Sequence, residues 1–263
     1  MVNIMQEIAI AIFCKNSIRK EKTVSNANSD NPRQEIEKAI AAGDLSKLLR
    51  MNGMLHGHFC PFSAMGVKAA VRAVRELGVR STGMEEVVAI VETNNCFSDG
   101  IQFITGCSFG NNALIYRDFG KTAFTLARRS GDGVRISVRA DRVSEERSPE
   151  ATQLFEKVVI ERGGSEDDKK HLSELWVKLS FRVLELPDEE VFDIKKVAVD
   201  VPAYARIFGS AKCSVCGENI MEPRARIKDG KAVCIPCSGQ EYYQLAGDGI
   251  SIKQEEPDEK KSA

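Results

Sequence analysis

Four cysteines near the end of the chain constrain its folding more than any other feature. Cys213, Cys216, Cys234 and Cys237 follow the spacing Cys-x2-Cys-x17-Cys-x2-Cys. Each Cys-x2-Cys pair places two thiolates on one tight turn, and two such turns can surround a tetrahedral zinc ion. A module this small has little apolar core, so bound zinc is expected to supply much of its folding free energy. The spacing predicts a structural zinc finger and disfavours four unrelated buried cysteines.

The chain as a whole has the composition of a globular protein. It has 263 residues, of which 43% are hydrophobic, and a formal net charge of -1. With this near-zero net charge the protein as a whole has no electrostatic attraction to nucleic acid or to an anionic membrane surface. The apolar run from Ile8 to Cys14 is about a third of a membrane span, and no lysine or arginine precedes it. We therefore predict a cytoplasmic protein with no membrane contact, whose eight cysteines are metal ligands or reactive thiols.

Hydrophobic periodicity predicts an α+β core. From Pro61 to Leu77 the apolar residues recur at three and four positions, which indicates an amphipathic helix with Lys68 on its polar face. The segments EVVAIVET and NALIYRDFG predict strands, and KTAFTLARR with VRISVRAD predicts a β-hairpin. The expected fold is a mixed, largely antiparallel sheet with helices packed on it.

Composition changes along the chain predict five segments. They are a flexible N-terminal arm (1–31), the α+β metal-binding core (32–186), a linker (187–211), the four-cysteine zinc finger (212–245) and a disordered tail (246–263).

A second group of ligand-type residues lies immediately before Pro61. The stretch HGHFC contains His56, His58 and Cys60, and thus two of the three histidines of the chain. If this stretch is extended, side chains two residues apart share a face, and all three would point the same way. Pro61 suits the first position of a helix, which places Cys60 at the N-cap, where the helix dipole favours a thiolate.

Three further residues could complete a cleft with this group. Cys96 lies between a predicted strand and a predicted helix, Asp99 follows three residues later, and Cys107 comes directly after that helix. Strand ends and helix starts are common places for sites, so we expect a cleft lined by these residues together with His56, His58 and Cys60. The alternative is that Cys96 and Cys107 are small buried apolar residues.

Several motifs resemble the FmdE family of formylmethanofuran dehydrogenase proteins. They are HGHFCPFSAMG, VVAIVETNNCFSDGIQFITGCSFGNNALIYRDFGK and the tail CSVCGENIMEPRARIKDGKAVCIPC, which also resembles zinc fingers of the DksA and TraR type. The resemblance implies an often dimeric α+β core with a metal-binding cleft. Motif by motif, it implies cleft ligands among His58, Cys60, Cys96 and Cys107. Asp99 and His56 are the candidates for proton transfer, and His56 could equally be a direct ligand or orient the loop.

The resemblance implies one function and leaves two alternatives. The first is an enzymatic or accessory subunit of a formylmethanofuran dehydrogenase, an oxidoreductase of one-carbon metabolism and methanogenesis. The alternatives are a metal-delivery or molybdoenzyme accessory protein, and a zinc-finger regulator that contacts polymerase or nucleic acid. From Lys212 to Lys231 no aromatic residue lies between the basic residues of the finger, so nucleic acid is the less favoured partner. We expect a homodimer, other dehydrogenase subunits as partners, one structural zinc, and a second ion, zinc, in the cleft.

Overall fold

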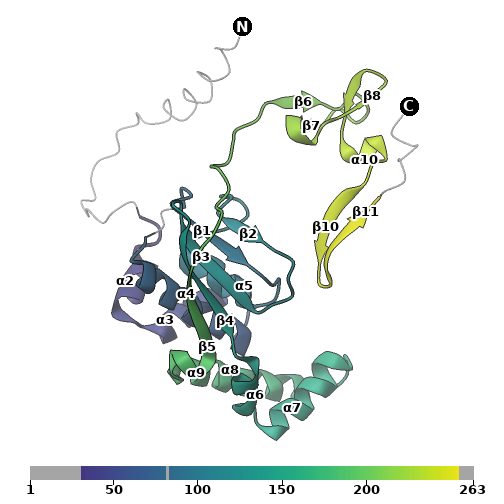
Figure 1. The fold of residues 1–263 in the computed structure, drawn as a ribbon. Coiled ribbons are helices and arrows are strands. Elements are labelled where there is room, and N and C mark those ends of the chain that lie inside the picture. The colour runs from purple at the N-terminus through teal and green to yellow at the C-terminus, as the bar shows by residue number, and fades with distance from the viewer. Residues whose placement is uncertain (1–30, 81–82, 255–263) are drawn as a thin grey trace, which may run out of the picture. The chain divides into compact units, whose positions relative to one another are not determined.

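A computed structural model describes residues 31–80 and 83–254 (Figure 1). The predicted arm, apart from Asn31, and residues 255–263 of the predicted tail lie outside this range. None of the helices in the described ranges combines the length and the apolarity that crossing a membrane requires.

A five-stranded sheet forms the centre of the core, with its strands in the order β2-β1-β3-β4-β5 (Figure 1). β1 and β2 are parallel, and the other neighbouring strands are antiparallel. The strands are β1 (Val87–Val91), β2 (Leu114–Tyr116), β3 (Ala123–Arg128), β4 (Asp132–Val138) and β5 (Phe192–Ala198). The prediction of a mixed, largely antiparallel sheet is confirmed. The parallel pair arises because a helix connects β1 to β2.

Helices supply the apolar side chains that pack against one face of this sheet. Val87, Ala89 and Val91 of β1 contribute to this core, since alternate residues of a strand share a face. The helices that bury side chains in it are α2 (Gln34–Ala42), α3 (Leu45–His56), α4 (Pro61–Leu77), α5 (Phe97–Thr105) and α8 (Glu166–Glu185). Shorter elements are α6 (Ala140–Glu145), α7 (Pro149–Phe155), the π-helical turn η1 (Glu156–Ile160) and α9 (Asp188–Val191).

The C-terminal module consists of three two-stranded sheets and two short helical turns. β6 (Ser210–Lys212) pairs with β7 (Asn219–Met221), and β8 (Arg226–Lys228) pairs with β9 (Lys231–Val233). β10 (Tyr242–Ala246) pairs with β11 (Gly249–Lys253). The helical turns are η2 (Glu222–Arg224) and α10 (Ile235–Ser238).

Two predicted boundaries are wrong. Residues 187–198 do not belong to a linker, because they form α9 and then β5, which pairs with β4 along its whole length. Phe192 and Ile194 pack toward the core, but charged residues alternate with them and weaken the apolar signal. The tail is also shorter than predicted, since β11 lies within residues 246–263.

Lys68 is buried rather than placed on a polar face of α4. Its Nζ donates hydrogen bonds to the carbonyl oxygens of Leu184, at 2.9 Å, and Leu186, and it lies 3.5 Å from the Asp188 carboxylate. The last carbonyls of a helix have no partner within it, so this lysine satisfies groups at the end of α8. Burial lowers its pKa from the ordinary lysine value. The positive charge of Lys68 suggested a polar surface position and gave no indication that the side chain contacts the end of α8.

Two glycines allow α4 and α5 to touch backbone to backbone. A Cβ atom added to Gly66 would collide with the carbonyl group of Phe97, and one added to Gly100 would lie 2.8 Å from the carbonyl oxygen of Ser63. Neither glycine has a positive φ, so close approach rather than turn geometry requires them. This contact brings the N-termini of α4 and α5 side by side.

We predict that Gly100→Ala lowers the free energy of unfolding by about 2 kcal/mol, because the added methyl must push two helices apart. Urea titration followed by circular dichroism measures this loss. Gly110→Ala is the control, since the nearest atom to its added Cβ would be Ser108 Oγ at 3.9 Å, and its effect should stay within about 0.5 kcal/mol. Equal effects of the two substitutions would contradict the packing argument.

Candidate metal centre

The end of α3 determines which histidine faces the candidate site. His56 is the last residue of α3, and Gly57 follows in the left-handed conformation (φ 85°), with its N–H bonded to the carbonyl of Gly53. The condition considered above, that HGHFC is extended throughout, is therefore not met, since only its end at Cys60 has extended backbone angles (φ -142°, ψ 155°). A glycine at this position readily ends a helix in the left-handed conformation, so the helix continues to His56 and then turns sharply.

Two cysteines occupy the N-cap positions of the helices that the glycine contact brings together, and only Cys60 makes a capping hydrogen bond. Cys60 is the N-cap of α4, as predicted, and its Sγ accepts a hydrogen bond from the Ser63 N–H at 3.4 Å. Cys96 is the N-cap of α5. Asn52 of α3 donates to the Ser63 hydroxyl at 2.7 Å, and both of these polar side chains are fully buried. The hydrogen bond fixes α3 to the first turn of α4, directly behind Cys60.

Three ligand-type atoms converge between these helix ends. The ring nitrogens and thiols of His56, Cys60 and Cys96 supply one atom each, all within 4.8 Å of one another. His56 Nε2 lies 3.6 Å from Cys60 Sγ. Two ligands at ordinary Zn–N and Zn–S bond lengths and a tetrahedral angle are separated by about 3.6 Å. The donor set therefore fits zinc, and it supplies three of the four ligands of a tetrahedral site.

A carboxylate holds the imidazole of His56 in place. His56 Nδ1 lies 2.7 Å from Asp99 Oδ2, so Nδ1 donates to Asp99 and Nε2 is the nitrogen that faces Cys60 and could bind an ion. Gln102 donates from Nε2 to Asp99 Oδ1 at 3.2 Å. Gln102 was not among the site residues predicted from the sequence, although its position three residues after Asp99 on a predicted helix places both on one face.

His58 and Cys107 lie outside the convergent group. The His58 ring is exposed and stacks near His56, with ring centroids 4.4 Å apart. Cys107 is fully buried in the hydrophobic core, where its thiol donates to the Val87 carbonyl at 3.7 Å. Of the four cleft ligands implied by the family motifs, the structure brings together Cys60 and Cys96, and it adds His56 to them.

The two thiols share their titration. The hydrogen bond to Cys96, followed by burial, raises the pKa of Cys60, whereas the hydrogen bond from Cys60 lowers the pKa of Cys96 to about 6. The first proton is therefore lost from Cys96. At neutral pH the pair already offers one thiolate to an incoming cation.

We predict that in zinc-free protein the reaction of Cys96 with iodoacetamide accelerates as the pH rises through about 6, because only the thiolate attacks. The measurement is the alkylation rate of the Cys96 peptide by mass spectrometry between pH 4 and 9. Cys60→Ala removes the hydrogen bond and should move the midpoint to higher pH. A midpoint that is the same in both proteins would show that Cys60 does not lower this pKa.

The tail cysteines form a second, closed group. Cys213, Cys216, Cys234 and Cys237 place their sulfurs within 4.8 Å of one another. Cys216 Sγ lies 3.9 Å from Cys234 Sγ, close to the separation of about 3.8 Å for two sulfurs on tetrahedral zinc. The Ser214 N–H donates to the Ala232 carbonyl at 2.8 Å and joins the two turns. Four thiolates complete the coordination, so this site is structural.

We predict that Cys216→Ser releases one zinc and unfolds the C-terminal module while the core keeps its structure, since the core has its own apolar interior. Limited proteolysis should cut only after the last core strand, β5. Ser214→Ala is the matched control because its structural contact is made by the backbone, and it should retain the zinc. Loss of the far-ultraviolet circular dichroism of the whole protein would contradict this separation.

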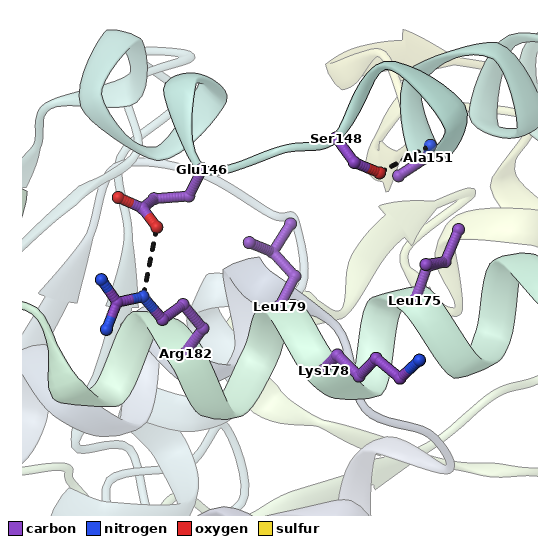
Figure 2. Close-up of a pocket in the computed structure, with 7 residues that line it drawn as sticks. All are labelled: Glu146, Ser148, Ala151, Leu175, Lys178, Leu179 and Arg182. Carbon is purple, nitrogen blue, oxygen red and sulfur yellow. Dashed lines mark hydrogen bonds and ion pairs between the residues drawn. The ribbon is translucent and has the colours of Figure 1, made fainter.

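A pocket of about 210 Å³ lies between α7 and α8, outside both groups (Figure 2). Leu175 and Leu179 of α8 line it, and Arg182 Nε lies 3.2 Å from the Glu146 carboxylate. The Arg182 charge is thus satisfied within the protein, and the pocket contains none of the thiols or imidazoles of the metal centre.

The two groups lie in segments of the chain that two different family models match. The family model described as "FmdE, Molybdenum formylmethanofuran dehydrogenase operon" matches residues 55–193, and the "Prokaryotic dksA/traR C4-type zinc finger" matches residues 206–243. A protein of Archaeoglobus fulgidus, described as a probable S-adenosyl-L-methionine-binding protein, is 45% identical over 219 residues. These cover 81% of this chain and 58% of the relative.

A solved structure is also similar. It is described as an FmdE-like protein of the tungsten formylmethanofuran dehydrogenase type, from Syntrophus aciditrophicus. It is 21% identical, covers 83% of this chain and 97% of its own, and superposes with a TM-score of 0.46.

Proposed function

The chain belongs to the FmdE family, and from this premise we propose that it is a zinc-dependent protein of one-carbon metabolism, an enzymatic or accessory subunit working with a formylmethanofuran dehydrogenase. The observation that carries the proposal is the convergence of His56, Cys60 and Cys96 at zinc-ligand separations. A three-ligand site leaves a position for a substrate or water, whereas the tail tetrad leaves none.

The core residues would have separate roles in metal binding and in positioning. Cys60, Cys96 and the Nε2 atom of His56 would hold the ion, which when bound would polarise a carbonyl oxygen or lower the pKa of a water molecule. Asp99 positions His56 through the 2.7 Å hydrogen bond to Nδ1. The Asp99 side chain is 37% exposed, so it can also accept a proton from a group beside the centre.

Zinc content tests the proposal directly. We predict two equivalents in the wild type and one in Cys60→Ser and Cys96→Ser, with the core still folded, because each substitution removes one ligand of the open site. Cys107→Ala is the control. Its thiol lies in the core, so this variant should keep both equivalents although its thermal stability falls.

The measurement is metal analysis of purified protein beside circular dichroism. One equivalent in the wild type and in all variants would contradict the proposal and leave only the tail site.

The expected partners are part of the same proposal. A subunit or accessory role requires copurification with dehydrogenase subunits, whereas a delivery role requires zinc transfer to an apoenzyme without stable association. We also propose a homodimer, for which twice the chain mass in solution at micromolar concentration is the expected result.

S-adenosylmethionine binding is a second candidate function. The name of the Archaeoglobus fulgidus relative favours it, since 81% of this chain aligns with that protein. Equilibrium dialysis with labelled S-adenosylmethionine tests it, and S-adenosylhomocysteine, which lacks the sulfonium charge, is the matched competitor.

A further inference from the structure

A second cavity lies beside the metal centre, where β1 and β2 end. It has a volume of about 180 Å³. Because β1 and β2 are parallel, their carboxyl ends meet at one edge of the sheet, a usual position for ligand sites in such sheets. The side chains that matter for its chemistry are Val91, Asp99, Gln102, Phe109, Leu114 and Tyr116.

The electrostatics of this cavity favour a positive charge. Among the described residues, neither lysine nor arginine lines it, and Asp99 is its carboxylate. In a zinc-loaded centre two thiolates would cancel the charge of the ion, and a His56 ring bound through Nε2 would be neutral, so the Asp99 carboxylate would have no counter-ion among the metal ligands. A carboxylate or phosphate ligand would be repelled here, whereas a cation would be stabilised.

The lining also contains the uncharged polar residues Thr93, Asn94, Asn95 and Ser98, and its aromatic and apolar part suits an organic cation better than a metal ion. Phe109 and Tyr116 provide aromatic rings, which attract cations through their π faces. The Tyr116 hydroxyl donates to Asp118 Oδ1 at 2.7 Å, and burial followed by this contact raises its pKa to about 12, so the ring is neutral and a second carboxylate lies behind it. Val91 and Leu114 offer apolar contacts for methyl or methylene groups.

We propose that this cavity binds a small organic cation, a sulfonium or an alkylammonium group, beside the metal position. The volume is below the range of about 300–1,000 Å³ typical of drug-sized ligands, so the cavity holds the charged end of a ligand and not a whole nucleotide. Asp99 supplies the opposite charge and Phe109 with Tyr116 supplies the aromatic walls. This inference goes beyond the proposed zinc function, because the cavity residues include none of the three metal ligands.

The test compares cations with neutral ligands of the same shape, using full-length zinc-loaded protein. The probes are choline with its neutral isostere 3,3-dimethylbutan-1-ol, and 2-hydroxyethyl-dimethylsulfonium with 3-methylbutan-1-ol. Titrations followed by amide chemical shifts should give at least tenfold tighter binding of each cation than of its isostere. If the sulfonium probe binds more tightly, the cavity is assigned to S-adenosylmethionine-type ligands. If choline binds more tightly, it is assigned to alkylammonium ligands. Both results support the proposal.

Variants identify the residues responsible. Asp99→Asn should weaken binding of the cations at least tenfold and leave the neutral probes unchanged, whereas Asp132→Asn, an acid-to-amide change on β4, should alter neither. Phe109→Leu keeps the apolar bulk and should lose part of the preference for cations. Equal binding of cations and isosteres, or unchanged cation binding in Asp99→Asn, would overturn the proposal.

Zinc content distinguishes a failure of the cation site from a failure of the proposed metal centre. Cation binding in a wild type that holds one zinc would overturn the metal centre and leave the cation site standing. Two zinc equivalents without preference for cations would overturn the cation site alone.

Discussion

The contact between Gly66 and Gly100 determines what the core can do. It lets the backbones of α4 and α5 approach more closely than any side chain would allow, and it places their N-termini together. Each of these N-termini carries a cysteine at its N-cap position, where the helix dipole favours a thiolate, and the Cys60 sulfur also accepts a hydrogen bond from the Ser63 amide. The ligand pair is therefore a consequence of helix packing, and neither cysteine needs a loop of its own to reach the other.

The two zinc-type groups differ in how the chain builds them. The tail tetrad comes from two short turns, each defined by local spacing, so the sequence predicted all four of its members. The core group joins residues from the end of α3, the start of α4 and the start of α5. An assembly of this kind needs the whole core to be folded first. An open coordination position can then be maintained by rigid helices, while the closed tetrad gains its rigidity from the metal.

Local patterns predicted the parts of the fold that local physics decides. The period of α4, the Pro61 start and the Cys60 cap follow from side-chain spacing and proline geometry. Local patterns did not predict that His56 rather than His58 faces the metal centre. This depends on whether α3 ends one residue before or after Gly57. Tertiary contacts decided the rest. Lys68 is buried because the end of α8 needs donors, and β5 forms because an edge of β4 needs a partner.

Asp99 connects the two kinds of chemistry that the core offers. One of its oxygens orients the imidazole of His56, and the other accepts from Gln102 on the same helix. With His56 bound to zinc through Nε2, both contacts would be with uncharged groups, so they would fix the position of the carboxylate without cancelling its charge. The charge therefore remains available on the side of the cavity that Phe109 and Tyr116 line. A ligand attracted by that charge would lie beside the open position of the metal centre. Asp99 would then hold this ligand next to the ion and, through His56, also orient a ligand of the ion itself.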